Sequence, residues 1–147
     1  MEQSSHVEPI TILLVEDNPG DSRLVQEVFK EGKVANTLII AKDGVEAMTI
    51  LRNSNNTHPD LILLDLNLPR KRGLDVLSEV KSDPELKRIP VIVLTTSDDE
   101  KDILKSYDLH ASAYLTKPVD LNEFITVIRN LENFWLTLVK FPPKRKS

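Results

Sequence analysis

The chain has 147 residues, a length typical of a single domain that buries a sizeable core. Its hydrophobic content of 40% argues against wholesale disorder, and its formal net charge of −4 argues against a protein whose whole surface binds nucleic acid. It contains no cysteine, which excludes disulfides, thiolate nucleophiles and cysteine-ligated zinc.

The amino-terminal segment, residues 1–9, is polar and lacks the basic stretch and apolar core of a signal peptide. No apolar run approaches the roughly 18 residues that a membrane-spanning helix needs. We therefore expect a flexible segment over 1–9, followed by a soluble, cytoplasmic domain that has no membrane partner.

Five short apolar runs predict the strands of a parallel sheet. Three of them are continuously apolar and rich in β-branched residues, as strands buried on both faces are. The runs are 12–15, 38–41, 61–64, 91–94 and 113–115. About 20 to 30 residues separate consecutive runs, which is room for one helix and two short loops.

Amphipathic segments between and after these runs predict five helices. Asn18 is expected to cap the first, with Pro19 in its first turn, and Pro84 is expected to end the third. The predicted helices lie within 18–32, 45–51, 73–84, 98–109 and 120–138. Strands and helices alternate, so the pattern predicts a doubly wound (βα)5 fold with helices on both faces of one sheet.

A polar residue follows four of the predicted strands. Glu16 and Asp17 follow the first, Asp65 the third and Thr95 the fourth, while Lys117 comes shortly after the fifth. Each of them alone could simply cap a helix or begin a loop. In a doubly wound fold, however, the carboxyl ends of the strands meet at one edge, where ligands bind. Three carboxylates, a hydroxyl and an ammonium together suit a magnesium-assisted phosphoryl acceptor.

Four motifs make the chain resemble the receiver domain of two-component response regulators, the CheY-like family. They are 12–18 (ILLVEDN), 63–69 (LLDLNLP), 90–96 (PVIVLTT) and 111–118 (ASAYLTKP). Each motif is weak alone, whereas all four in this order and spacing are very specific. The resemblance covers residues 10 to 136 and implies a flavodoxin-like sheet of five parallel strands in the order 2-1-3-4-5.

The resemblance implies a phosphoacceptor and a metal site. Asp65 would be the phosphoacceptor. Asp17 and Asp65 would bind Mg²⁺ directly, with the backbone carbonyl of Asn67 as a third protein ligand and Glu16 acting through water. Mn²⁺ or Ca²⁺ can substitute for Mg²⁺ in such a site. Many receiver domains have two aspartates where this chain has Glu16 and Asp17.

The resemblance also implies a switch. Lys117 and Thr95 would each pair with a phosphoryl oxygen. Thr95 would move toward the phosphoryl group, and the ring of Tyr114 would turn inward into the space left behind. The face formed by the fourth helix, fifth strand and fifth helix would then be remodelled. The peptide bond between Lys117 and Pro118 is expected to be cis.

A narrower likeness implies the partners. The single-domain form and the sequence of residues 132–135 (ENFW) resemble the small response regulators that partner cyanobacterial phytochrome kinases. By this likeness, the donor would be a histidine kinase of the phytochrome type, and the message would pass by protein–protein contact to a target protein. Such a protein is not an enzyme beyond its own phosphorylation and dephosphorylation.

The carboxyl-terminal region carries an apolar surplus. We expect the receiver domain to span 10–138 and a tail to span 139–147. Around this boundary lie the apolar residues Phe134, Trp135, Leu138 and Phe141. They can fold back on their own domain or pack against a second copy, and the homodimer is slightly favoured. The basic end is interpreted as solvated, without nucleic-acid binding.

Two other classes share part of the pattern. A phosphatase of the haloacid dehalogenase type needs a second acid two residues after its nucleophile, where this chain has Asn67. A flavin-binding flavodoxin-like module needs a phosphate-accepting first loop, whereas Glu16 and Asp17 would repel a phosphate. A degenerate receiver used only for docking is disfavoured by the intact set of site residues.

Overall fold

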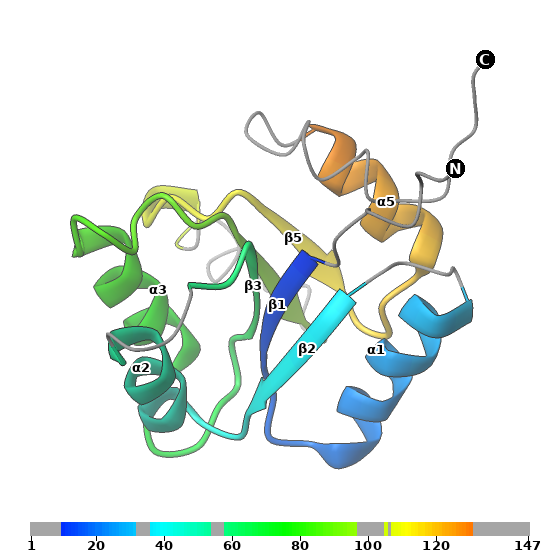
Figure 1. Cartoon of the computed structure of the whole chain (residues 1–147), viewed down its shortest axis with the longest axis horizontal. Coiled ribbons are helices and arrows are strands. Elements are labelled where there is room, and N and C mark those ends of the chain that lie inside the picture. Colours follow the sequence, from blue (N-terminus) through cyan, green and yellow to red (C-terminus); the bar gives the residue numbers. More distant parts are fainter. Residues whose placement is uncertain (1–9, 32–35, 54–57, 97–104, 106, 131–147) are drawn as a thin grey trace, which may run out of the picture.

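The computed structural model describes residues 10–31, 36–53, 58–96, 105 and 107–130 (Figure 1). The strands are β1 (Ile10–Val15), β2 (Asn36–Ala41), β3 (Leu61–Asp65), β4 (Val91–Thr95) and β5 (Ala113–Thr116). The helices are α1 (Pro19–Glu31), α2 (Gly44–Arg52), α3 (Gly73–Ser82) and α5 (Leu121–Asn130). Most of the fourth predicted helix, and the part of the fifth beyond residue 130, lie outside the described residues.

The five strands form one parallel sheet in the order β2-β1-β3-β4-β5. Helices α2 and α3 cover one face of this sheet, while α1 and α5 cover the other (Figure 1). The predicted doubly wound fold and its strand order are therefore confirmed. Within the described residues, no helix is both long and apolar enough to cross a membrane.

Alternation along the central strands supplies a hydrophobic layer on each face. In β1, Leu13 and Val15 belong to the layer beneath α2 and α3, whereas Ile12 and Leu14 belong to the layer beneath α1 and α5. Every residue of β3 and β4 is buried, as continuous apolar runs between two helical layers require. The sheet is therefore held on both sides, which fixes the positions of its strand ends.

Local hydrogen bonds set where the helices begin. The side chain of Asn18 accepts a bond from the backbone N–H of Asp21 at 3.0 Å, as expected for the cap of α1. At α2, Asp43 accepts from the N–H of Glu46 at 2.8 Å, and Glu46 accepts from the N–H of Lys42 at 2.7 Å. These bonds start α2 at Gly44, one residue earlier than its apolar pattern predicts.

Gly73 packs the start of α3 against the backbone that follows β3. A Cβ atom at this position would lie 2.6 Å from the Cα of Leu66 and even closer to the carbonyl oxygen of Asp65. Both are backbone atoms, so they cannot rotate away as a side chain can. The helix can approach the end of β3 this closely only without a side chain at position 73.

We predict that Gly73→Ala destabilises the protein by about 1 to 3 kcal/mol, because the added methyl group overpacks a backbone contact. The control is Gly20→Ala in α1, where the nearest atom to the new Cβ is the side-chain oxygen of Asn18 at 3.1 Å. That side chain can shift, so the control should change stability by less than about 1 kcal/mol. Urea denaturation measures both, and equal midpoints for the two variants would contradict the assigned packing.

Candidate functional site

The carboxyl edge of the sheet brings together the residues that the sequence singled out. Glu16 and Asp17 follow β1, Asp65 ends the neighbouring β3, and Thr95 ends β4 beside it. Lys117 follows β5, and its backbone N–H donates to the carbonyl of Thr95 at 2.9 Å. Glu16, Asp65 and Thr95 are buried, whereas Asp17 is exposed to solvent. The site therefore consists of buried polar side chains that adjoin the solvent at Asp17.

Three carboxylates at this edge form a group that suits a metal ion. Glu16, Asp17 and Asp65 each offer one oxygen, and these oxygens all lie within 4.8 Å of one another. The backbone N–H of Asn67 donates to Oδ1 of Asp65 at 3.0 Å, and the N–H of Asn18 donates to Oε2 of Glu16 at 3.2 Å. A set of anionic oxygen donors, oriented by the backbone and open on one side, fits hard divalent cations such as Mg²⁺ and Mn²⁺.

The ammonium of Lys117 lies among the carboxylates. Its Nζ is 2.7 Å from Oε1 of Glu16, 2.9 Å from Oδ2 of Asp21 and 3.2 Å from Oδ2 of Asp65. The lysine is partly buried, and the peptide bond to Pro118 is cis, the conformation expected from the sequence. One cation is thus shared by acids from β1, α1 and β3.

The balance of charge shifts the pKa values of two groups. Burial raises the pKa of Glu16 to about 7; the hydrogen bond from Lys117 opposes this rise, and the neighbouring Asp65 adds to it. For Lys117, burial acts to lower the pKa, but hydrogen bonds to Glu16 and Asp21, together with the charge of Asp65, outweigh it and raise the pKa above its ordinary value. The ammonium therefore stays charged, whereas Glu16 ionises less readily than an ordinary glutamate.

The expected switch residues, Thr95 and Tyr114, lie on the neighbouring strands β4 and β5. Thr95 is buried at the end of β4. Tyr114 in β5 is 37% exposed, and its ring meets that of Tyr107 edge-on with centroids 6.0 Å apart. In this structure the tyrosine ring thus lies at the surface. The inward orientation that the resemblance implies for the switched protein is not the orientation of this structure.

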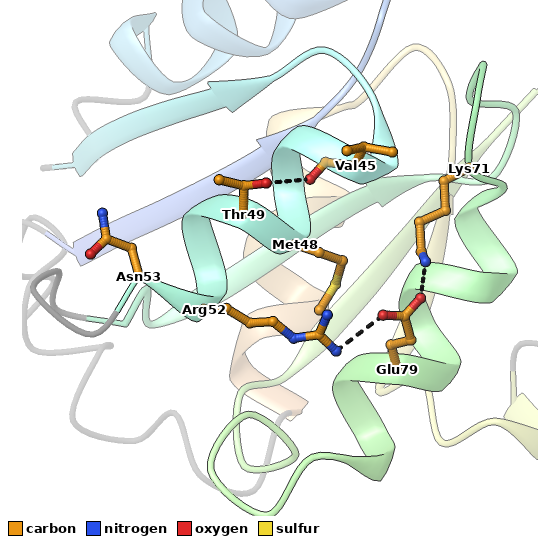
Figure 2. Close-up of a pocket in the computed structure, with 7 residues that line it drawn as sticks. All are labelled: Val45, Met48, Thr49, Arg52, Asn53, Lys71 and Glu79. Atoms are coloured by element: carbon orange, nitrogen blue, oxygen red, sulfur yellow. Dashed lines mark hydrogen bonds and ion pairs between the residues drawn. The ribbon is translucent and has the colours of Figure 1, made fainter.

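A hollow of about 580 Å³ lies between α2 and α3, and none of the site residues predicted from the sequence lines it (Figure 2). Glu79 lies between two cations there, Lys71 and Arg52, and the distance from Nη2 of Arg52 to Oε1 of Glu79 is 3.1 Å. The charged side chains that line this hollow are paired with one another. Glu79 is the one acid among the described residues that line it, so the hollow has no cluster of acids like that at the carboxyl edge. The sheet edge is therefore the stronger candidate for the functional site.

Asp21 is the site residue that the sequence did not single out. An acid in the first turn of α1 interacts favourably with the helix dipole, and that interaction is enough to explain an aspartate at this position. One signal in the sequence could have identified it: Asp21 comes only six residues after the end of β1. A helix that starts so close to the sheet edge places the side chains of its first turn near that edge. The apolar tail residues Phe134, Trp135, Leu138 and Phe141 lie outside the described residues.

Comparisons with known proteins identify the family. The chain matches the response regulator receiver domain over residues 12–129. It is 51% identical over 138 residues to response regulator Rcp1 of Synechocystis sp. (strain ATCC 27184 / PCC 6803 / Kazusa), covering 91% of this chain and 94% of that protein. The chain therefore belongs to the response regulator receiver domain family, as its motifs predict.

Two solved structures extend this result. The Mn²⁺-bound form of response regulator Rcp1 has 50% sequence identity and a TM-score of 0.73, covering 92% of this chain and 100% of that one. The phosphorylated cyanobacterial phytochrome response regulator RcpA has 48% identity and a TM-score of 0.74, covering 92% and 99%. The predicted likeness to cyanobacterial phytochrome response regulators is thereby confirmed.

We predict that the metal-free protein loses stability as the pH rises from about 4.5 to about 7. The folded state keeps the proton of Glu16 up to about pH 7, whereas the unfolded chain releases it near pH 4.5. The folded state binds more protons within that window, so its free energy of unfolding falls as the pH rises, by up to about 3 kcal/mol.

Urea denaturation in a chelator at several pH values measures this fall. Glu16→Gln should remove most of it, whereas Glu27→Gln, on the exposed side of α1, should keep it. Added Mg²⁺ should also suppress the fall, because a divalent cation favours the ionised carboxylates. Identical pH dependences for the wild type and Glu16→Gln would show that Glu16 is not the titrating group.

Proposed function

We propose that this protein accepts a phosphoryl group from a histidine kinase onto Asp65 and thereby switches its surface for a partner protein. The observation that supports this most directly is the placement of Asp65 itself. Its carboxylate is buried at a strand end, held by the N–H of Asn67 and faced by the ammonium of Lys117. A buried carboxylate with a fixed orientation and an adjacent cation is equipped to act as an oxygen nucleophile.

The cluster of carboxylates supports a requirement for a divalent cation. Asp17 and Asp65 would hold Mg²⁺ directly, with the backbone carbonyl of Asn67, and Glu16 would act through water. Mg²⁺ bound there would neutralise the negative charge that the carboxylate of Asp65 and the phosphoryl group bring together. Mn²⁺ is an alternative, since the Rcp1 structure is described as an Mn²⁺-bound form.

The phosphoryl transfer is a displacement at phosphorus. An oxygen of Asp65 forms a bond to phosphorus, while the bond between phosphorus and the kinase imidazole nitrogen breaks and its electron pair stays on that nitrogen. Lys117 holds a phosphoryl oxygen by its charge, and the hydroxyl of Thr95 donates to another. These residues position the group and stabilise its charge, which is most of what phosphoryl transfer asks of a protein.

The structure offers a route from the phosphoryl group to the surface. Thr95 ends β4, and the neighbouring β5 carries Tyr114, whose ring is at the surface. A phosphoryl group adds negative charge and strong acceptor oxygens. If Thr95 moves toward them, Tyr114 can turn into the vacated space, and the surface around β5 and α5 changes. The phosphoryl group biases two states that already exist.

The relatives support the choice of partner. RcpA is described as a phosphorylated cyanobacterial phytochrome response regulator, and this chain is 48% identical to it. We propose a histidine kinase of the phytochrome type as donor and a second copy of this chain as a further partner, reached through the apolar tail. Chemistry beyond its own phosphorylation and dephosphorylation is not part of the proposed function.

We predict that Asp65→Asn abolishes the uptake of phosphoryl label from an autophosphorylated histidine kinase of the phytochrome type in the presence of Mg²⁺. The amide keeps the shape of the carboxylate but removes its nucleophilic charge. The matched control is Asp75→Asn, on the exposed first turn of α3, which should be labelled like the wild type. Full labelling of Asp65→Asn would overturn the proposed acceptor.

We further predict that phosphorylation promotes dimers. Sizing of the full chain with and without beryllofluoride, a phosphoryl mimic, should show a larger dimer fraction when the mimic is bound. Trp135→Ala should reduce that fraction, because burial of the apolar tail would drive association. A monomer that does not change on activation would count against the tail as an interface.

A further inference from the structure

Lys117 has no spare hydrogen-bond donor in this structure. An ammonium carries three N–H groups. Each has an acid within reach: Glu16 at 2.7 Å, Asp21 at 2.9 Å and Asp65 at 3.2 Å. A phosphoryl oxygen arriving at Asp65 can be paired by Lys117 only if one of these three partners gives way.

The three partners differ in how easily they can release the ammonium. The side chain of Glu16 is 1% exposed and that of Asp65 is 4% exposed, so water cannot readily take the place of the ammonium at either acid. The side chain of Asp21 is 35% exposed, so water can replace the lysine there. Asp21 is thus the partner whose release costs least.

The local structure of α1 also allows the carboxylate of Asp21 to remain charged without its contact to Lys117. It lies in the first turn, where the helix dipole favours a negative charge. Its backbone is held by Asn18 through a 3.0 Å hydrogen bond, so the helix start does not depend on the side-chain contact with Lys117. The acids whose oxygens gather for a metal ion are Glu16, Asp17 and Asp65, and Asp21 is not among them.

We propose that Asp21 is a positioning residue that holds Lys117 in the unphosphorylated state and competes with the phosphoryl group for its ammonium. This inference rests on the proposed phosphorylation of Asp65. Asp21 has two effects on that reaction: it keeps one N–H of Lys117 occupied, and it places a further negative charge near the arriving phosphoryl group. Both effects raise the barrier to phosphorylation by small anionic donors. Such donors make no protein–protein contacts with this chain that could offset the two effects.

The test compares Asp21→Asn with the wild type at saturating Mg²⁺, so that differences in metal affinity do not contribute. The amide keeps the size of the carboxylate and removes its charge. Phosphorylation by acetyl phosphate should become roughly two- to tenfold faster, and the half-saturating concentration of beryllofluoride should fall by a similar factor. The difference should shrink as ionic strength rises, because Asp21 is partly exposed to solvent.

Two controls separate this role from simpler ones. Glu27→Gln removes the same charge from an exposed position of α1 and should leave the rate and the beryllofluoride affinity close to those of the wild type. Asp21→Glu restores the charge and should behave like the wild type, which a purely structural role in the helix start would not require. Thermal melts of all three variants check that the fold is retained.

The results distinguish a failure of the role inferred for Asp21 from a failure of the proposed phosphoacceptor. If Asp21→Asn matches Glu27→Gln in rate and beryllofluoride affinity, or is slower than the wild type, Asp21 does not compete for Lys117 and this inference is wrong. If acetyl phosphate labels Asp65→Asn as fully as the wild type, the phosphoacceptor itself is wrong, and the proposed function fails first. Faster labelling of Asp21→Asn together with no labelling of Asp65→Asn supports both.

Discussion

The imbalance of charge at the carboxyl edge of the sheet constrains the rest of the molecule. The ammonium of Lys117 contacts the carboxylates of Glu16, Asp21 and Asp65, and an oxygen of Asp17 lies within 4.8 Å of oxygens of Glu16 and Asp65. Like charges this close repel one another, and burial strengthens the repulsion by excluding water. The hydrophobic layers on both faces of the sheet hold the strand ends in place against it. The same imbalance makes the edge suited to a divalent cation, whose charge would offset the excess of carboxylates.

The fold and the site are joined most tightly behind Asp65. The residue ends a fully buried strand in the middle of the sheet, with β1 and β4 on either side. Gly73 brings α3 against its backbone, and the N–H of Asn67 holds its carboxylate. Asp65 is therefore held rigidly, whereas Tyr114 and Asp21, the residues proposed to respond to its phosphorylation, are partly exposed to solvent. This division suits a switch in which a fixed centre alters a movable surface.

Much of the fold and most of the site could be predicted from the sequence. Continuous apolar runs marked the strands because strands buried on both faces admit few polar residues, and the polar residues after four of the runs marked the strand ends. The start of α2 was missed by one residue, because it is set by the hydrogen bonds between Asp43 and Glu46 and not by the apolar pattern. Asp21 was missed because an acid in a first helical turn already has an ordinary explanation.

The amino-acid sequence by itself determined the order of strands and helices, the family, and the identity of Asp65 as the central acid, since these depend on local patterns and on spacing along the chain. Only the tertiary structure decided how the charges are shared. Lys117 and Asp21 are 96 residues apart in sequence, yet their charged atoms lie 2.9 Å from each other. The pairing depends on how α1 is seated against the end of β5, and it arises from the packing of distant segments, which no local pattern encodes.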